Sequence, residues 1–275
     1  MPPMQIVVCL KQVLDPDGVN AYALWGRLRV DERGTGFVAD SAIPQIVNAY
    51  DEQAVEAALR LRDAGVDCRI TALTVGPDAA AALLRRAIAM GADAGIHVAD
   101  AAGPGTDGFR TAALIAAAVR EIGDVGLVLC GRQGSDYDQG VVPAVLAERL
   151  AWPFVSMAAG AQPEGGGAGA LRVVRATPLG EETVRVSLPA VVSVSNEIGT
   201  PRYPSSRRMM EARRIPPVVR PARELLGGEG PRAVELAQLF IPDVQGHCEV
   251  IQGETPEEKA AALLRRLRET RALGG

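Results

Sequence analysis

The chain contains 275 residues, of which 48% are hydrophobic, and this is enough apolar material to bury a full core. Its formal net charge of -4 at pH 7 lacks the excess of Lys and Arg that nucleic-acid-binding proteins carry, so we expect no nucleic-acid partner. No run reaches the ~18 apolar residues that a membrane span needs, and no charged leader precedes the first strand, which predicts a cytoplasmic protein without membrane insertion.

The first 150 residues alternate between short apolar strands and helices. The predicted strands, rich in β-branched residues, are residues 4–10, 69–75 and 126–130. The predicted helices are residues 51–64, 78–90, 107–122 and 141–150. This alternation predicts an α/β fold with a doubly wound, mostly parallel sheet that helices cover on both faces.

The third of these strands runs directly into a loop rich in Gly and Asp, residues 131–140, which leads into the next helix. Backbone N–H groups at a helix N-terminus after a buried parallel strand favour phosphate binding. The loop is not a P-loop, because no Gly-Lys-Ser or Gly-Lys-Thr follows, and it has no G-x-G-x-x-G fingerprint. We therefore expect a nucleotide site here, and the alternative is a tight strand-to-helix connection with a capping Asp.

The pattern changes after residue 153. Residues 171–176 and 182–188 alternate between polar and apolar side chains, which predicts an antiparallel hairpin turning at residues 177–181, and a buried strand follows at residues 189–195. The Gly-rich run at residues 165–169 is interpreted as a mobile hairpin tip.

Beyond Thr200 the composition shifts to Pro, Arg and polar residues without long periodic segments, which predicts an extended C-terminal arm. The basic run at residues 207–214 is either a solvated connection or a docking patch. A last amphipathic helix opens with a capping box at Thr255 and a proline at its first position. Its apolar side chains, at helical spacing, are Ala260, Leu263, Leu264 and Leu267. We expect two domains, an α/β nucleotide-binding domain at residues 1–200 and the arm with its helix at residues 201–275.

The cysteines and histidines lack the spacing of a disulfide framework or of metal ligands, so no metal site is expected. These residues are Cys9, Cys68, Cys130, Cys248, His97 and His247. His97 lies in an apolar stretch and is expected to be structural.

Several short segments, taken together in order and spacing, resemble the β subunit of electron transfer flavoproteins over residues 4–214. The segments are residues 11–15 (KQVLD), 48–56 (NAYDEQAVE), 75–77 (VGP), 86–93 with 95–98, 131–133 (GRQ), and 188–192 with 201–204.

The resemblance implies a Rossmann-like, adenine-nucleotide-binding subunit that pairs with an α subunit into a heterodimer holding FAD. It also implies a second nucleotide in the β subunit, which is AMP in housekeeping members and another FAD in electron-bifurcating members. Electrons would pass from flavin dehydrogenases to a membrane quinone oxidoreductase or a ferredoxin-linked acceptor. The chain would not be an enzyme in its own right, and no catalytic residue is expected.

The resemblance also implies which residues line the adenine nucleotide. They are Cys9, Asn48, Ala49, Tyr50, Asp51, Val75, Gly131, Arg132, Gln133, Gly134, Ser135, Asp136, Tyr137, Asp138, Gln139, Gly140, Val141 and Val142. Backbone at Cys9 and Val75 would meet the adenine and ribose, and the loop after Gly131 would meet the phosphates.

Departures from the family pattern affect this site. Val141, Val142 and Pro143 stand where members usually have Gln-Thr-Gly or Gln-Val-Gly, so a side-chain amide and a backbone N–H are missing, which predicts weakened or rearranged phosphate binding. Asp136 and Asp138 would repel phosphate, and we expect them to cap the helix or to accept hydrogen bonds from ribose hydroxyls or backbone N–H groups.

Two further departures concern electron transfer. Pro16 replaces an aromatic residue that approaches the flavin, and Ser206 replaces a leucine that anchors the partner dehydrogenase. Met209 and Met210 either supply the apolar anchor instead or pack into the arm's own core.

Two other classes of protein are considered. A stand-alone sensor of adenine nucleotides would form a stable monomer or homodimer without flavin. An adenylate-forming or pyrophosphatase-type enzyme would need a Ser- and Gly-rich phosphate loop at the first strand, and residues 10–13 (LKQV) do not provide one.

Overall fold

The structure is a computed structural model. It describes residues 3–32, 34, 36, 43–100, 107–165, 169–228, 230, 233–241, 248–270 and 272. The chain divides into a large unit, Met1–Phe240, and a small unit, Ile241–Gly275.

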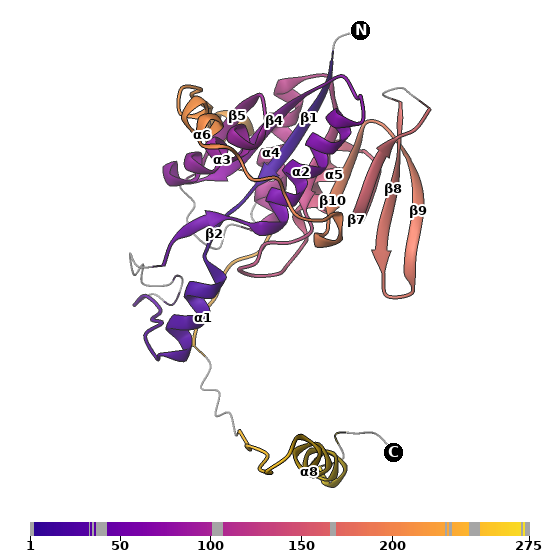
Figure 1. The fold of residues 1–275 in the computed structure, drawn as a ribbon. Helices are drawn as coiled ribbons and strands as arrows, with labels where there is room; N and C mark the ends of the chain where they lie inside the picture. The colour runs from indigo at the N-terminus through magenta and orange to yellow at the C-terminus, as the bar shows by residue number, and fades with distance from the viewer. Residues whose placement is uncertain are drawn as a thin grey trace. The chain divides into compact units, whose positions relative to one another are not determined.

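A single large sheet forms the centre of the first unit (Figure 1). Its strands within the described ranges are β1 (Met4–Leu10), β4 (Cys68–Gly76), β5 (Ala94–Ala99), β6 (Val125–Gly131), β7 (Phe154–Pro163), β8 (Ala170–Thr177), β9 (Gly180–Ser187), β10 (Ala190–Val194) and β11 (Val218–Pro221). Their order is β11-β5-β4-β1-β6-β10-β7-β8-β9, with parallel pairing from β11 to β7 and antiparallel pairing among β7, β8 and β9. The predicted mostly parallel sheet and its antiparallel hairpin are thus confirmed.

Helices cover both faces of this sheet. They are α2 (Ala49–Asp63), α3 (Ala81–Met90), α4 (Gly108–Ile122), α5 (Val142–Leu150), α6 (Ser206–Ala212) and α7 (Ala222–Leu226), with short 3-10 turns η1 (Asp78–Ala80) and η2 (Asn196–Ile198). The central strand explains the two layers, because its alternate residues point to opposite faces. Ile6 and Val8 join the buried cluster under α2 and α3, while Val7 and Cys9 join the cluster under α4, α5 and α7.

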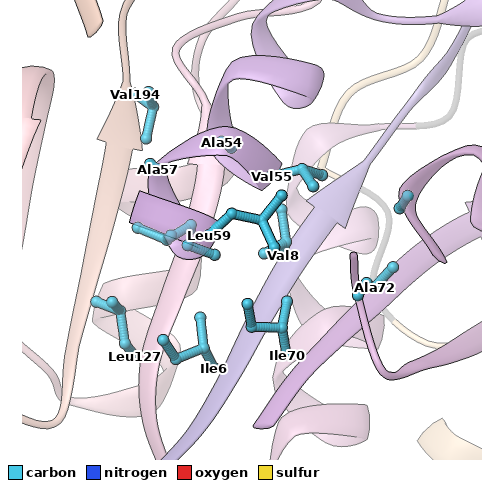
Figure 2. Close-up of a cluster of buried hydrophobic side chains, with 14 of the residues drawn as sticks. Ile6, Val8, Ala54, Val55, Ala57, Leu59, Ile70, Ala72, Leu127 and Val194 are labelled. Carbon is cyan, nitrogen blue, oxygen red and sulfur yellow. The ribbon is translucent and has the colours of Figure 1, made fainter. Parts of the chain in front are cut away.

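Figure 2 shows the first cluster, in which α2 lies over β1, β4, β6 and β10. Ala54, Val55 and Leu59 on α2 are almost completely buried against Ile6 and Val8. This packing fixes the N-terminal turn of α2 above the carboxyl ends of the strands, which is where ligands bind in open α/β sheets.

Helix boundaries follow the local signals that the sequence carries. Asp107 is the N-cap of α4, and its Oδ1 accepts a hydrogen bond from Phe109 N at 2.7 Å. α3 ends at Gly91, whose φ of 139° favours glycine. The four helices predicted in this region are confirmed, with ends shifted by at most a few residues.

A small antiparallel pair, β2 (Gln12–Leu14) with β3 (Gln45–Val47), and the helix α1 (Pro16–Leu24) were not predicted. The two strands have three residues each, too few for a periodic pattern. α1 begins after Asp15, whose carboxylate accepts a hydrogen bond from Asp17 N at 3.2 Å.

Strand β7 was also not predicted. Its sequence, FVSMAAGAQP, is rich in Ala and Gly, and its polar and apolar side chains do not alternate. The register of its pairing with β10 shifts near Met157, where φ is 61°. The Gly-rich run expected as a mobile tip follows β7, and residues 166–168 of it lie outside the described residues.

Residues 201–228 belong to the first unit and add α6, β11 and α7 to it. Arg202 bonds to Glu56 and Asp63 on α2, and β11 pairs with β5. The predicted boundary at residue 200 therefore lies inside the first unit, because contacts of single side chains and a four-residue strand hold the arm without any long periodic pattern.

The second unit contains α8 (Pro256–Glu269), which begins as predicted. Thr255 Oγ1 accepts a hydrogen bond from Glu258 N at 3.2 Å, and Glu258 Oε2 accepts one from Glu254 N at 2.9 Å. None of the helix's side chains is buried. In the part of the chain that the structure describes, no helix combines the length and apolar character that crossing a bilayer requires.

Candidate nucleotide-binding site

The candidate site lies where β1, β4 and β6 end and where α2 and α5 begin. Cys9 is near the end of β1, Val75 near the end of β4, and Gly131 is the last residue of β6. β1 lies between β4 and β6, so the three strand ends are neighbours at one edge of the sheet.

Asp51, in the first turn of α2, connects two of these strand ends. Its Oδ2 accepts a hydrogen bond from Lys11 N at 2.6 Å, and its Oδ1 accepts one from Gly131 N at 3.1 Å. Only 6% of the residue is exposed. Burial raises the pKa of Asp51 from 3.8 to about 7, although both hydrogen bonds act to lower it.

Gly131 allows this close approach of α2 to β6. A β carbon at this position would overlap Asp51 Oδ1 and would lie 2.8 Å from the carbonyl carbon of Tyr50. The glycine is therefore required by steric contact, which explains why the loop begins with a residue that has no side chain.

Asn48, the residue before α2, holds the loop itself. Its Nδ2 donates a hydrogen bond to the carbonyl oxygen of Gln133 at 2.8 Å, and its Oδ1 accepts one from Ser135 N at 3.2 Å. The residue is 1% exposed and makes no side-chain cap of α2. Asn48 is therefore a buried residue that fixes the position of the loop through both polar atoms of its amide group.

Lys11 was not among the predicted site residues, although it belongs to a segment that carries the resemblance. Its Nζ lies 2.6 Å from Asp136 Oδ1 and 5.4 Å from the centre of the Tyr137 ring. Its backbone also bonds to Asp51 and Asn48. The available signal was a lone cation directly after a buried strand, where a positive charge can meet a phosphate.

Arg132 and Gln133 organise the outer part of the loop. The Arg132 guanidinium lies 5.0 Å from the centre of the Tyr50 ring, and Arg132 N donates a hydrogen bond to Val194 O at 2.9 Å. Gln133 Nε2 donates one to Asp138 Oδ1 at 2.7 Å.

The two loop aspartates do not cap α5, contrary to one of the roles expected for them. Asp136 Oδ1 accepts from Tyr137 N at 3.0 Å as well as from Lys11, so it does satisfy a backbone N–H group. Asp138 instead accepts from Gln133, and its φ of 50° turns the chain away from the helix. The reason is distance along the chain, since α5 has its N-cap only at Val141.

The start of α5 offers few polar groups. Val141 makes no side-chain cap, Val142 is the first helical residue and Pro143 has no N–H group. Gly108 at the start of α4 lies so close that a β carbon there would be 2.6 Å from Val141 Cγ2. The N-termini of α4 and α5 are therefore neighbours, with apolar side chains between them.

The Ser135 hydroxyl group makes no hydrogen bond to the described part of the protein. Its Oγ is buried, and within the described ranges no hydrogen-bond partner lies near it. Buried hydroxyls are normally paired, so this one is available to a ligand in the loop.

Below the loop lie two thiols on neighbouring strands. Hydrogen bonding to the Cys9 thiol, together with burial, raises the pKa of Cys130 well above its ordinary value. Cys130 is therefore neutral, and both cysteines are buried apolar side chains at the ends of β1 and β6. Among the described residues, no group of three or more His, Cys, Asp and Glu side chains is placed to hold a metal ion.

The structure thus brings most predicted residues together through the hydrogen bonds of α2 and Asn48 with the loop. Val75 and Cys9 contribute the adjacent strand ends, while Gln139 and Gly140 lead to α5, with φ of 62° at Gly140. The list of contacts with a nucleotide itself remains a prediction.

A family model described as "Electron transfer flavoprotein domain" matches residues 35–225. The chain is similar to the "Caffeyl-CoA reductase-Etf complex subunit CarD" of Acetobacterium woodii, with 32% identity over 97% of this chain and 98% of the relative.

Two further relatives are similar to the chain. The "Acryloyl-CoA reductase electron transfer subunit gamma" of Anaerotignum propionicum is 32% identical over 96% of this chain and 98% of the relative. The "Electron transfer flavoprotein subunit beta" of Mycobacterium tuberculosis is 33% identical over 76% of each chain.

Proposed function

Because the chain belongs to the electron transfer flavoprotein β-subunit family, we propose that it binds an adenine nucleotide at the site described above and serves in an FAD-containing electron-transfer complex. The observation that carries the proposal is the loop that Asn48 and Asp51 hold in place at the sheet edge, with Ser135 Oγ buried and unpaired inside the described structure.

The residues present fit an adenine nucleotide in part. The Lys11 ammonium and the Ser135 hydroxyl are donors suited to phosphate oxygens. Cys9 and Val75 supply the strand ends against which an adenine would lie. The apolar start of α5 does not contribute a side-chain donor, so we assign phosphate contacts to the loop rather than to Val141 and Val142.

The redox chemistry would belong to FAD, which can exchange electrons singly or in pairs when bound. This chain's residues would bind and orient the nucleotide and exclude water from it. The proposal includes an α subunit that shares the FAD, and it leaves AMP and a second FAD as the two candidates for the site in this chain.

The acceptor or donor is proposed from the relatives. Two of them, covered along nearly their whole length, are named as subunits that work with caffeyl-CoA reductase and with acryloyl-CoA reductase. We therefore propose that the partner is a flavin-dependent enzyme acting on CoA thioesters, and a quinone oxidoreductase is the second candidate.

The surface around α6 suits such a partner. Tyr203 is 82% exposed, and Met209 and Met210 are exposed at 40% and 63%, so the alternative in which both methionines pack into the arm's own core does not hold. Ser206 begins α6 and offers no apolar anchor. The two methionines are therefore proposed as the flexible apolar contact, and the arginines beside them as its charged rim.

The experiment is to co-express the chain with a candidate α subunit, purify the complex, and measure released FAD and AMP per heterodimer. One FAD with one AMP, or two FAD, would support the proposal and decide between the two candidates. Asn48→Ala is expected to lower the content of the second nucleotide severalfold, whereas Asn20→Ala on the exposed side of α1 is the matched control. A stable lone chain that binds AMP or ATP without flavin would contradict the proposal and favour the sensor.

A further inference from the structure

We infer that Asp51 is a positioning residue that ties the loop of residues 131–140 to α2, and that the tie holds only while its carboxyl group is ionised. The inference rests on the proposed nucleotide site where it concerns affinity. Its structural part concerns the free chain and can be tested without any nucleotide.

The geometry gives Asp51 two tasks at once. The Oδ2 atom holds the residue that follows β1, and the Oδ1 atom holds the residue that ends β6. Both partners are backbone N–H groups, which can donate hydrogen bonds but cannot accept them. A carboxylate satisfies both, and it does so from the rigid first turn of a helix packed on the sheet.

A protonated carboxyl group cannot satisfy both. Its hydroxyl oxygen would direct a hydrogen toward an N–H group, so one of the two hydrogen bonds would be lost. The loop starts at Gly131, and the Lys11 side chain forms an ion pair with Asp136 in the loop. Loss of either hydrogen bond to Asp51 would therefore loosen one end of the nucleotide-binding loop.

The surroundings place this protonation near neutral pH. The groups that face Asp51 are the Lys11 side chain, the Asn48 amide, the Cys130 thiol with Cys9 beside it, and Asp136 through its ion pair with Lys11. Burial outweighs the nearby donors and raises the pKa of Asp51 to about 7. The two hydrogen bonds from backbone N–H groups to Asp51 therefore change within a pH range in which the folded protein can be studied.

Nucleotide affinity should follow the ionised fraction of Asp51. If only the ionised form presents the closed loop, the apparent Kd for AMP rises about tenfold between pH 8 and pH 6. Asp51→Asn mimics the protonated form, so it should bind weakly at pH 8 and lose this part of the pH dependence.

The binding test uses calorimetric titration of AMP into the full-length chain between pH 6 and pH 8. The AMP phosphate also titrates in this range, but it contributes equally to the wild type and to Asp51→Asn, so the difference between them reports on Asp51. Glu52→Gln, the neighbouring residue on α2 whose carboxylate bonds to Arg86 instead, is the matched control and should keep the wild-type profile. Equal profiles for wild type and Asp51→Asn would overturn the inference.

A second measurement needs no ligand and only the wild-type fold. The amide resonances of Lys11 and Gly131, followed by NMR from pH 5 to pH 8, should shift together with one midpoint near 7. If they do not titrate, the inference is wrong whether or not AMP binds. If they titrate but AMP does not bind at any pH, the tie stands and the proposed nucleotide site fails.

Discussion

Gly131 is a single residue on which the geometry of the site depends. A side chain there would overlap the Asp51 carboxylate and press on the Tyr50 backbone, and both belong to a helix fixed by its packing on the sheet. Since α2 cannot move without losing that packing, Gly131→Ala should destabilise the fold by about 2 kcal/mol. Urea denaturation would measure the change in the free energy of unfolding.

The matched control for this substitution is Gly169→Ala. A β carbon at Gly169 meets no other atom within 4 Å among the described residues, so the same chemical change should cost less than about 0.5 kcal/mol. Equal effects at the two glycines would contradict the steric explanation of the loop's first residue.

The raised pKa of Asp51 leads to a second prediction, because a pKa that differs between the folded and unfolded chain makes the free energy of unfolding depend on pH. The folded chain holds the proton up to about pH 7, whereas the unfolded chain releases it near pH 3.8, so the folded state binds more protons between these values. The stability that this proton provides is present at low pH and is lost as the pH rises toward 7. The loss is on the order of 4 kcal/mol.

Thermal or urea denaturation at several pH values would measure this slope. Asp51→Asn cannot titrate, so its free energy of unfolding should lack this component, and the difference between wild type and variant should grow from pH 4 to pH 7. A constant difference would show that Asp51 has an ordinary pKa. The ionised carboxylate is therefore a group that costs stability while it orders the loop, a combination typical of functional sites.

At the scale of elements, a network of ion pairs holds the segment that begins at residue 201 against α2. Glu56, whose side chain is 6% exposed, accepts hydrogen bonds from Arg202 Nε at 2.8 Å and from Arg60 Nε at 3.0 Å. Burial acts to raise the pKa of Glu56, but these hydrogen bonds hold it below its usual 4.5. The stability from this pairing is therefore present above pH 4.5 and is lost as the pH falls below it.

Arg202→Ala should leave the buried Glu56 carboxylate with only part of its partners. We expect a loss of about 2 kcal/mol in the free energy of unfolding at pH 7, with a smaller loss at pH 4. The exposed pair of Arg207 with Glu211 on α6 is the matched control, since Arg207→Ala should leave the free energy of unfolding essentially unchanged. An equal loss for both variants would contradict a special role of the buried network.

The elements differ in how far the sequence could predict them. α2 to α5 and the strands β4 and β6 were predictable, because each combines an apolar pattern with a local start or stop signal such as Asp107 or Gly91. β7 was not, since Met157 in a left-handed conformation breaks the alternation. β11 was not either, because a four-residue strand that follows one proline and ends in another forms only through pairing with β5.

The residues of the site divide in the same way, into those that the sequence could predict and those that it could not. The position of the loop and of residues 48–51 follows from strand-to-helix order, and the resemblance supplied their likely neighbours. The long-range side-chain bonds that shape the site join residues 40 to 125 positions apart, as with Asp51 to Lys11 and Lys11 to Asp136, and no local pattern encodes them. The role of Lys11 and the isolation of Asp138 from α5 therefore became visible only with the fold.

At the scale of the whole molecule, the C-terminal unit is distinguished by having no buried side chain among its described residues, 241, 248–270 and 272. α8 is amphipathic, yet none of its side chains is buried, and Leu263 and Leu264 are 45% and 42% exposed. An isolated helix of this length is marginal in water, and an exposed apolar stripe favours a partner. We propose that this stripe contacts the α subunit of the complex.

Truncation after Phe240 tests this proposal without disturbing the first unit. The arm up to that point is held by its own contacts, such as the hydrogen bonds from Ala233 N and Val234 N to Asp107, so the melting temperature should change by less than about 2 °C. Co-purification with the α subunit and its FAD should fall strongly. Unchanged assembly and flavin content would show that α8 does not make the contact.

A point-substitution series separates the apolar stripe from mere chain length. Leu263→Asp with Leu264→Asp adds two negative charges to the stripe, and Arg265→Asp makes the same change of charge on the opposite side of α8. If the stripe docks by burying its leucines, the double variant should weaken assembly at least tenfold, because two leucines contribute several kcal/mol when buried. Arg265→Asp should then assemble as the wild type does, whereas equal weakening by both would mean that charge rather than apolar contact holds the subunits together.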